Sequence, residues 1–148
     1  MAVMQIPRRV DYGLRAAIYL AGQDPEKNCF LGEIAAQQGI PRKFLEKILQ
    51  SLTRSGLVRS KRGPDGGYAL ARPPGEVSFR DIIEALEGPI AVNLCLDQQM
   101  TCSHLPRCAM VGVWNEIQRR VMDVFANTTL ADLKGRPVIN SSSLSSAA

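Results

Sequence analysis

The sequence contains no run of about eighteen consecutive apolar residues, which is the length that a membrane-spanning helix needs. Its first residues, MAVMQIPRRVDYGL, also lack the apolar core and the small-residue cleavage site of a secretory signal. We therefore expect a cytoplasmic protein that has no membrane partner and whose thiols stay reduced. At 148 residues, the chain is long enough for one domain of usual size with a buried core.

Histidine is almost absent, because His104 is the single one in the chain. A nucleophilic cysteine needs a base held close to it. His104 lies in the same irregular segment as three of the four cysteines, with no evident carboxylate to orient it. We therefore do not expect an enzyme.

Acidic residues are scarce between residues 41 and 72, where the sequence has only Glu46 and Asp65. The net charge of this stretch is +6, whereas the whole chain has +4 and the remainder therefore −2. Such a concentration is typical of a surface that binds a polyanion, although a solvated basic face would have the same composition. The stretch holds eight of the 18 basic residues, namely Arg42, Lys43, Lys47, Arg54, Arg59, Lys61, Arg62 and Arg72.

Residues 10–72 have the pattern of a winged helix-turn-helix. Apolar spacing predicts helices over residues 10–23, 31–38 and 41–55, and the third has an expected apolar face of Phe44, Leu45, Ile48, Leu49 and Leu52. Gly39 lies in the turn before the third helix, and Gly56 suits the left-handed position that ends it. LVRSKR, GPDGG and YALA then predict a β-hairpin with basic residues at its tip. The expected fold class is mainly α with a small β-hairpin wing.

The second half of the chain is predicted to join this domain to a long helix. Ser78 can cap a helix over residues 79–86, and the segment up to residue 107 is irregular. A helix over residues 108–127 has an apolar stripe formed by Met110, Trp114, Ile117, Val121, Val124 and Phe125. The simplest partner for this stripe is the same helix of a second copy, and packing within the chain is the alternative. The expected organisation is a winged-helix domain over 1–88, a cysteine-bearing loop over 89–107, a dimerisation helix with a short turn over 108–134, and a disordered tail over 135–148.

Three cysteines in the loop, Cys95, Cys102 and Cys108, have the spacing C-x6-C-x5-C. Zinc sites usually use two-residue gaps, whereas wider gaps on a loop suit an iron–sulfur cluster held by thiolates. A fourth ligand is then needed, and the sequence offers His104 in the loop or Asp11 at the start of the first helix. The remaining cysteine, Cys29, is more simply explained as a small buried hydrophobic residue. Structural zinc binding, and sensing by the thiols alone, stay open as alternatives.

Several segments together resemble the family of winged-helix regulators that contains the iron–sulfur regulator IscR and the nitric-oxide sensor NsrR. They are VDYGLRAAIYLA (10–21), IAAQQGIPRKFLEKILQSLTRSGLVRSKRGPDGGYALA (34–71), VSFRDIIEALEG (77–88), the three loop cysteines, and WNEIQ and TTLADL between residues 114 and 133. The wing sequence RGPDGGY followed by three spaced cysteines is the most specific part of the resemblance. The resemblance covers nearly the whole chain except the tail.

The resemblance implies a homodimeric transcriptional regulator with a [2Fe–2S] or [4Fe–4S] cluster bound by the three cysteines of each subunit. IscR-like proteins have a histidine three residues after the third cysteine, where this sequence has Val111. Nitric-oxide sensors of the family can instead use an acidic residue near the start of the first helix. Asp11 matches that position and would act across the dimer, so it is favoured over His104. The expected function is a repressor that responds to nitric oxide, redox or iron–sulfur status.

The third predicted helix and the wing supply the expected contacts with double-stranded DNA. Arg42, Lys43 and Glu46 are expected to read base edges, since Arg and Lys suit guanine and a carboxylate accepts from cytosine N4. The resemblance supports Glu46 in particular, and Arg62 in the wing can enter a narrow minor groove. A symmetric dimer would place two reading helices on a palindromic operator, about 34 Å apart. Phosphate contacts, which carry no sequence information, are expected from Lys43, Lys47, Arg54, Arg59 and Lys61.

Overall fold

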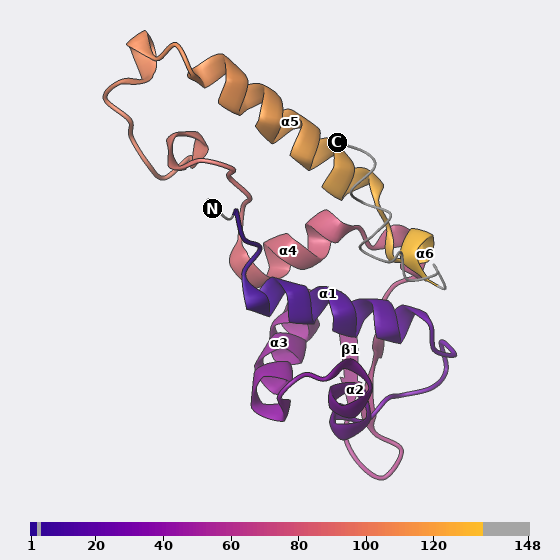
Figure 1. The fold of residues 1–148 in the computed structure, drawn as a ribbon. Coiled ribbons are helices and arrows are strands. Elements are labelled where there is room, and N and C mark those ends of the chain that lie inside the picture. Colours follow the sequence, from indigo (N-terminus) through magenta and orange to yellow (C-terminus); the bar gives the residue numbers. More distant parts are fainter. Residues whose placement is uncertain (3, 135–148) are drawn as a thin grey trace.

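A computed structural model of the chain describes residues 1–2 and 4–134 (Figure 1). The tail over residues 135–148, which the sequence predicts to be disordered, lies outside the described residues. No helix among the described residues is long and apolar enough to cross a membrane. The elements follow in the order α1 (Arg8–Ala21), α2 (Leu31–Gln38), α3 (Arg42–Arg54), β1 (Val58–Lys61), β2 (Gly67–Leu70), η1 (Pro74–Glu76), α4 (Phe79–Glu87), η2 (Leu94–Leu96), η3 (Leu105–Arg107), α5 (Val111–Asn127) and α6 (Leu130–Leu133).

The core lies between α1, α3 and α4, which contact one another. On α3 the buried side chains recur at helical spacing, and Leu45, Ile48, Leu49 and Leu52 are each at most 1% exposed. The sequence also predicted Phe44 on this face, and that prediction is wrong, because the Phe44 side chain is 57% exposed. Phe44 lies about 100° around the helix axis from Leu45, which puts it at the edge of the buried face.

The turn between α2 and α3 follows the predicted helix-turn-helix. α2 has the predicted bounds and ends at Gly39, whose φ of 61° and ψ of 38° lie in the left-handed region that favours glycine. Pro41 then caps α3, which begins at Arg42. At the other end of α3, Gly56 has a φ of 76°, so its predicted left-handed conformation is confirmed.

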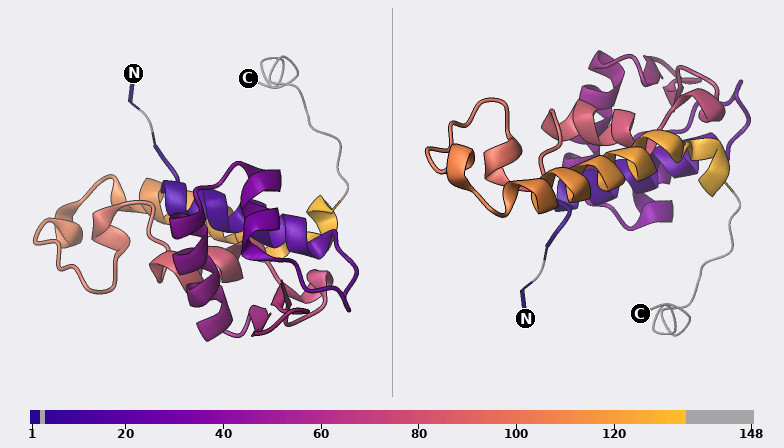
Figure 2. Two further views of the ribbon diagram at one scale, coloured as in Figure 1. Left: turned by 90° about the horizontal axis from the view of Figure 1, so that it is seen from below. Right: turned by 90° about the horizontal axis from the view of Figure 1, so that it is seen from above.

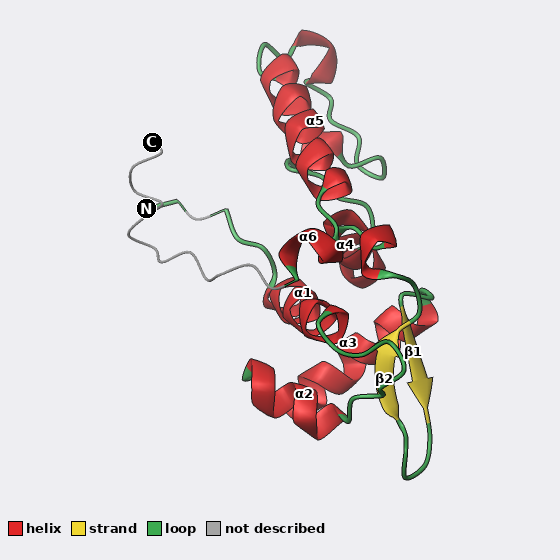
Figure 3. Cartoon of the chain, turned by 90° about the vertical axis from the view of Figure 1, so that its right-hand side faces the viewer, coloured by secondary structure: helices red, strands yellow, loops and turns green. Residues whose placement is uncertain are grey.

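The β1–β2 hairpin is the predicted wing. Its two strands are antiparallel, with Val58 opposite Leu70 and Lys61 opposite Gly67. Cys29 extends this sheet from the segment before α2, since its N–H and C=O each form a 2.8 Å hydrogen bond with the backbone of Tyr68. The wing is therefore attached at its base to the helix-turn-helix, while its tip projects from the molecule (Figure 3).

Capping boxes begin both α4 and α6. The Ser78 hydroxyl accepts a hydrogen bond from the N–H of Asp81, and the Asp81 carboxylate accepts from the N–H of Ser78, so the predicted cap is confirmed. Thr129 and Asp132 form the same arrangement at α6. The α5 helix begins at Val111, three residues later than predicted, because Cys108 has an extended conformation at the end of η3.

The long helix α5 packs against α4 along only part of its length (Figure 1). The rings of Phe125 on α5 and Phe79 on α4 stack with centroids 6.0 Å apart. No α5 residue is fully buried in the single chain, and Met110 beside its N-terminus and Val124 near its C-terminus are about 60% exposed. After α5 the chain returns to the core, where Leu130 is fully buried.

Candidate functional site

The outward side of α3 carries the predicted DNA-reading residues. Arg42, Lys43, Glu46 and Lys47 are all exposed, because the apolar residues of the same helix face the core. Within residues 1–2 and 4–134, none of these four side chains takes part in an ion pair. Their charges are therefore available to a polyanionic ligand. Arg54, the predicted phosphate contact in the last turn of α3, is also exposed.

The wing contributes three more predicted contacts, Arg59, Lys61 and Arg62, all of them exposed. Arg59 differs from the other two because its Nη2 donates a 2.6 Å hydrogen bond to the carbonyl oxygen of Pro25. This bond ties β1 to the segment between α1 and α2. The α2 and α3 helices and the wing together form the side of the molecule opposite α5 (Figures 1 and 3).

The loop with the three cysteines projects beyond the core beside the N-terminal end of α5 (Figure 2). Cys95 lies within η2, Cys108 caps η3, and Cys102 lies between these two turns. All three side chains are half-buried free thiols. In its chemistry this donor set fits an iron–sulfur cluster, whose usual ligands are four cysteine thiolates, and it supplies three of the four.

A surface hollow in this loop brings two of the three cysteines together. Cys95 and Cys102 line it with Met100, whereas Cys108 does not. No group of three or more Cys, His, Asp or Glu side chains in the described part of the chain is arranged to hold a metal ion. The described loop therefore does not bring its three thiols together into a preformed metal site.

Gln118 on α5 fixes the first limb of the loop. Its Nε2 donates to the carbonyl oxygen of Ile90 over 2.7 Å, and its Oε1 accepts from the N–H of Val92 over 2.8 Å. The side-chain amide thus pairs with the backbone much as a strand would, three residues before Cys95. The anchoring role of Gln118 is not among the sequence-based predictions, although a glutamine within an apolar stripe is a visible signal.

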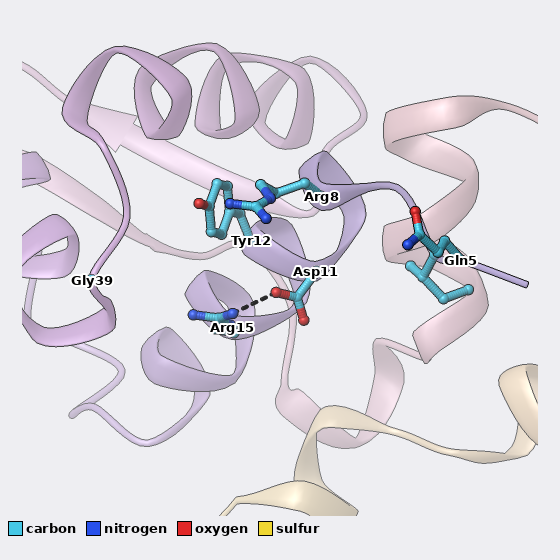
Figure 4. Close-up of a pocket in the computed structure, with 7 residues that line it drawn as sticks. Gln5, Arg8, Asp11, Tyr12, Arg15 and Gly39 are labelled. Atoms are coloured by element: carbon cyan, nitrogen blue, oxygen red, sulfur yellow. Dashed lines mark hydrogen bonds and ion pairs between the residues drawn. The ribbon is translucent and has the colours of Figure 1, made fainter. Parts of the chain in front are cut away.

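The two candidates for a fourth ligand have different surroundings. Asp11, in the first turn of α1, is half exposed, and its Oδ2 accepts a 2.6 Å hydrogen bond from Nη2 of Arg15 (Figure 4). It lines a surface pocket with Gln5, Tyr12 and Arg15. His104 is exposed at the start of η3.

Cys29 is fully buried, which confirms the interpretation of this residue as part of the core. Burial also raises the pKa of its thiol above the ordinary value, and the nearby carboxylate of Glu33 acts in the same direction. A thiol with a raised pKa is a poor nucleophile and a poor metal ligand at neutral pH. Cys29 is therefore distinct from the three loop cysteines.

The helix-turn-helix, the hairpin wing and the exposed basic side chains define a winged-helix DNA-binding protein. The chain belongs to the Rrf2 family, described as iron-dependent transcriptional regulators, which matches residues 6–136. It is therefore a DNA-binding transcriptional regulator.

Three known proteins illustrate the relationship. A Mycobacterium tuberculosis protein named as an HTH-type transcriptional regulator is 36% identical over 132 residues, which cover 89% of this chain and 82% of that protein. CymR, the global cysteine regulator of B. subtilis, has a similar structure, with a TM-score of 0.74 and 34% identity over 88% of this chain and 96% of CymR. IscR of T. potens has a TM-score of 0.70 and 29% identity over 88% of this chain and 85% of IscR.

Proposed function

We propose that this chain is a dimeric transcriptional repressor that senses its signal through an iron–sulfur cluster held by Cys95, Cys102 and Cys108. The observation that carries the proposal is the set of three free, half-buried thiols on one loop between the DNA-binding core and α5. The description of the family as iron-dependent and the similarity to IscR support it. Nitric oxide, oxidants or a shortage of clusters are the proposed signals.

The proposed fourth ligand is Asp11 of the partner subunit. The half-exposed carboxylate on the first turn of α1 supports this choice, since it is accessible to a second molecule. His104 is the alternative, and it lies only two residues from Cys102, which makes binding of one metal ion by both side chains awkward.

Dimerisation through α5 is proposed because the helix leaves apolar surface uncovered. Met110, Val113 and Val124 are each about 60% exposed in the single chain. Pairing of two such helices would bury these side chains and bring two copies of α3 to one palindromic operator. On each half-site, Arg42, Lys43 and Glu46 read bases and Arg62 enters the minor groove. Lys43, Lys47, Arg54, Arg59 and Lys61 contact phosphates.

When bound, the cluster supplies iron and sulfide that react with nitric oxide and oxidants. Cys95, Cys102 and Cys108 would hold the cluster, and Gln118 fixes the limb of the loop that leads to Cys95. Cys108 lies three residues before α5, so a change in its position bears directly on the start of that helix. The expected consequence is a shift between the two α3 helices of the dimer, which must meet both half-sites together.

Anaerobic purification tests the proposal. The wild-type protein is expected to be brown and to contain iron and acid-labile sulfide, and its DNA binding is expected to change on exposure to nitric oxide or oxidant. The triple variant Cys95→Ala, Cys102→Ala, Cys108→Ala is expected to be colourless and unresponsive. Cys29→Ala is the matched control, since it removes a buried thiol and should leave the iron content unchanged. Iron-free wild-type protein with a normal response would contradict the proposal.

A second candidate is a regulator that senses by thiols alone or carries a structural zinc ion. It is favoured by the hollow that Cys95 and Cys102 share without Cys108, and by the similarity to CymR, the global cysteine regulator. A zinc-bound protein would be colourless and contain zinc. A thiol-only sensor would respond without metal, and Cys108→Ala would leave that response intact while Cys95→Ala removed it.

A further inference from the structure

Phe44 is an exposed apolar side chain that lies among the charged residues on the surface of α3. It is the only large hydrophobic residue of this fully described helix that is exposed, with 57% of its surface open to solvent. Leu45, its neighbour, is fully buried. Core packing therefore accounts for only part of this ring, and the other outward residues of the helix are mostly charged.

The Phe44 ring is held in place from one side. Tyr12 on α1 is only 8% exposed, and the two rings meet edge to face with centroids 6.3 Å apart. The Arg15 guanidinium lies 5.5 Å from the centroid of the same Tyr12 ring. Phe44 therefore rests on a buried aromatic side chain, and its remaining surface faces outward.

The position of Phe44 on α3 places it beside proposed DNA contacts. Residues three apart on a helix are neighbours on its surface, so Phe44 adjoins Lys47. Glu46 lies on the other flank of the outward face, about 200° around the axis from Phe44. The helix thus offers an apolar group on one flank and a carboxylate on the other.

The major groove of DNA contains one apolar group that such a ring can recognise. The C5-methyl group of thymine projects into the groove, and apolar side chains, phenylalanine among them, discriminate thymine by contact with it. We propose that Phe44 is a specificity-determining residue that packs against a thymine methyl group in each half-site. This inference rests on the proposed role of α3 as the reading helix.

The experiment compares DNA with and without the methyl group. Duplexes that bind the wild-type full chain are selected from a random pool, and each thymine is replaced in turn by deoxyuridine, which lacks only the methyl group. At one position per half-site the wild-type affinity is expected to fall about fourfold, as for the loss of one buried methyl group. Phe44→Ala is expected to be insensitive to that replacement, and Phe44→Leu to keep part of the sensitivity. In the wild type, 5-methylcytosine at the same position should bind more tightly than cytosine.

Phe30→Ala is the matched control, because Phe30 is a similarly exposed ring that lies outside α3. This variant should lose affinity on deoxyuridine replacement as the wild type does. Equal losses for wild type and Phe44→Ala at every thymine would overturn the inference, as would a wild type that tolerates all replacements. If Lys43→Ala and Lys47→Ala also left DNA binding unchanged, α3 would not be the reading helix, and the proposed function would fail as well. A change of oligomeric state in Phe44→Ala without loss of thymine preference would assign Phe44 to a protein interface instead.

Discussion

Arg15 donates a hydrogen bond from Nη2 to Oδ2 of Asp11 over 2.6 Å, one helical turn apart on α1. The two side chains are about half exposed, at 46% and 50%. An ion pair this open to solvent contributes at most about 1 kcal/mol to stability. Asp11 can therefore exchange Arg15 for another partner at little expense to the fold, which makes its proposed role as a ligand testable by simple substitution.

Asp11→Ala is expected to fold normally but to alter the visible absorption spectrum of the iron-loaded protein and to speed the loss of iron to a chelator. The physical reason is that three thiolates remain while the fourth ligand is replaced by solvent. Asp24→Ala is a suitable control, since Asp24 is another exposed aspartate whose interactions are local to its turn. If His104→Ala produced the change and Asp11→Ala did not, the ligand would be His104.

Glu46→Ala is expected to change which base pair is preferred at one position of each half-site. A carboxylate accepts a hydrogen bond from cytosine N4, and discrimination of this kind is worth about 1–3 kcal/mol, or roughly five- to 150-fold in relative affinity. Competition binding against operators varied at each position measures it. Asp65→Ala removes the other acid of the basic stretch and should leave base preference unchanged. A uniform change of affinity on all sequences would count against a reading role for Glu46.

The helix-turn-helix and the wing could be predicted from the sequence because local signals coincide there. Apolar spacing and Gly39 specify α2 to the residue, and the glycine-rich turn specifies the hairpin. The prediction that Phe44 lies on the core-facing side of α3 is wrong because a period of 3.6 residues leaves the edge of a helical face ambiguous. The exposure of a residue at that edge depends on the neighbouring α1, where Tyr12 contacts the Phe44 ring.

For the cysteine loop, the sequence predicts which residues could be ligands but not how they are arranged in space. Cys95, Cys102 and Cys108 lie in a segment without helical or strand periodicity, so the pattern carries no information on how the thiols are oriented. Its anchoring depends on Gln118, more than twenty residues further along the chain. The place of this glutamine within an apolar stripe is visible in the sequence, but local spacing does not show which distant segment it contacts. A fourth ligand from a second subunit likewise cannot be predicted from the spacing of residues within one chain.

The contacts of Glu116 with two arginines on α5 can be tested by the pH at which its carboxyl titrates. Hydrogen bonds from Arg119 and then Arg120 lower the pKa of its carboxyl from 4.5 to about 2. The stabilisation of α5 by these contacts of the Glu116 carboxylate is therefore fully present above about pH 4.5, and it is lost as the pH falls through about 2. NMR titration should show the low pKa, and Arg119→Gln should raise it. Since the carboxylate is exposed, high salt should also raise it. An ordinary pKa in the wild type would contradict this arrangement.

Gln118→Ala is expected to release the limb of the loop that leads to Cys95. The variant loses two hydrogen bonds to half-buried backbone groups of residues 90 and 92, with a net loss of about 1–3 kcal/mol. The amide of Val92 should then exchange with solvent faster, and the iron-loaded protein should lose its visible absorption sooner under a chelator. Gln118→Glu is the informative comparison, because a carboxylate still accepts from the N–H of Val92 but cannot donate to the carbonyl oxygen of Ile90. The Gln118→Glu variant should keep the Val92 amide protected from exchange, while the limb of the loop is held less firmly than in the wild type. Unchanged exchange at Val92 in Gln118→Ala would show that the loop is positioned by other contacts.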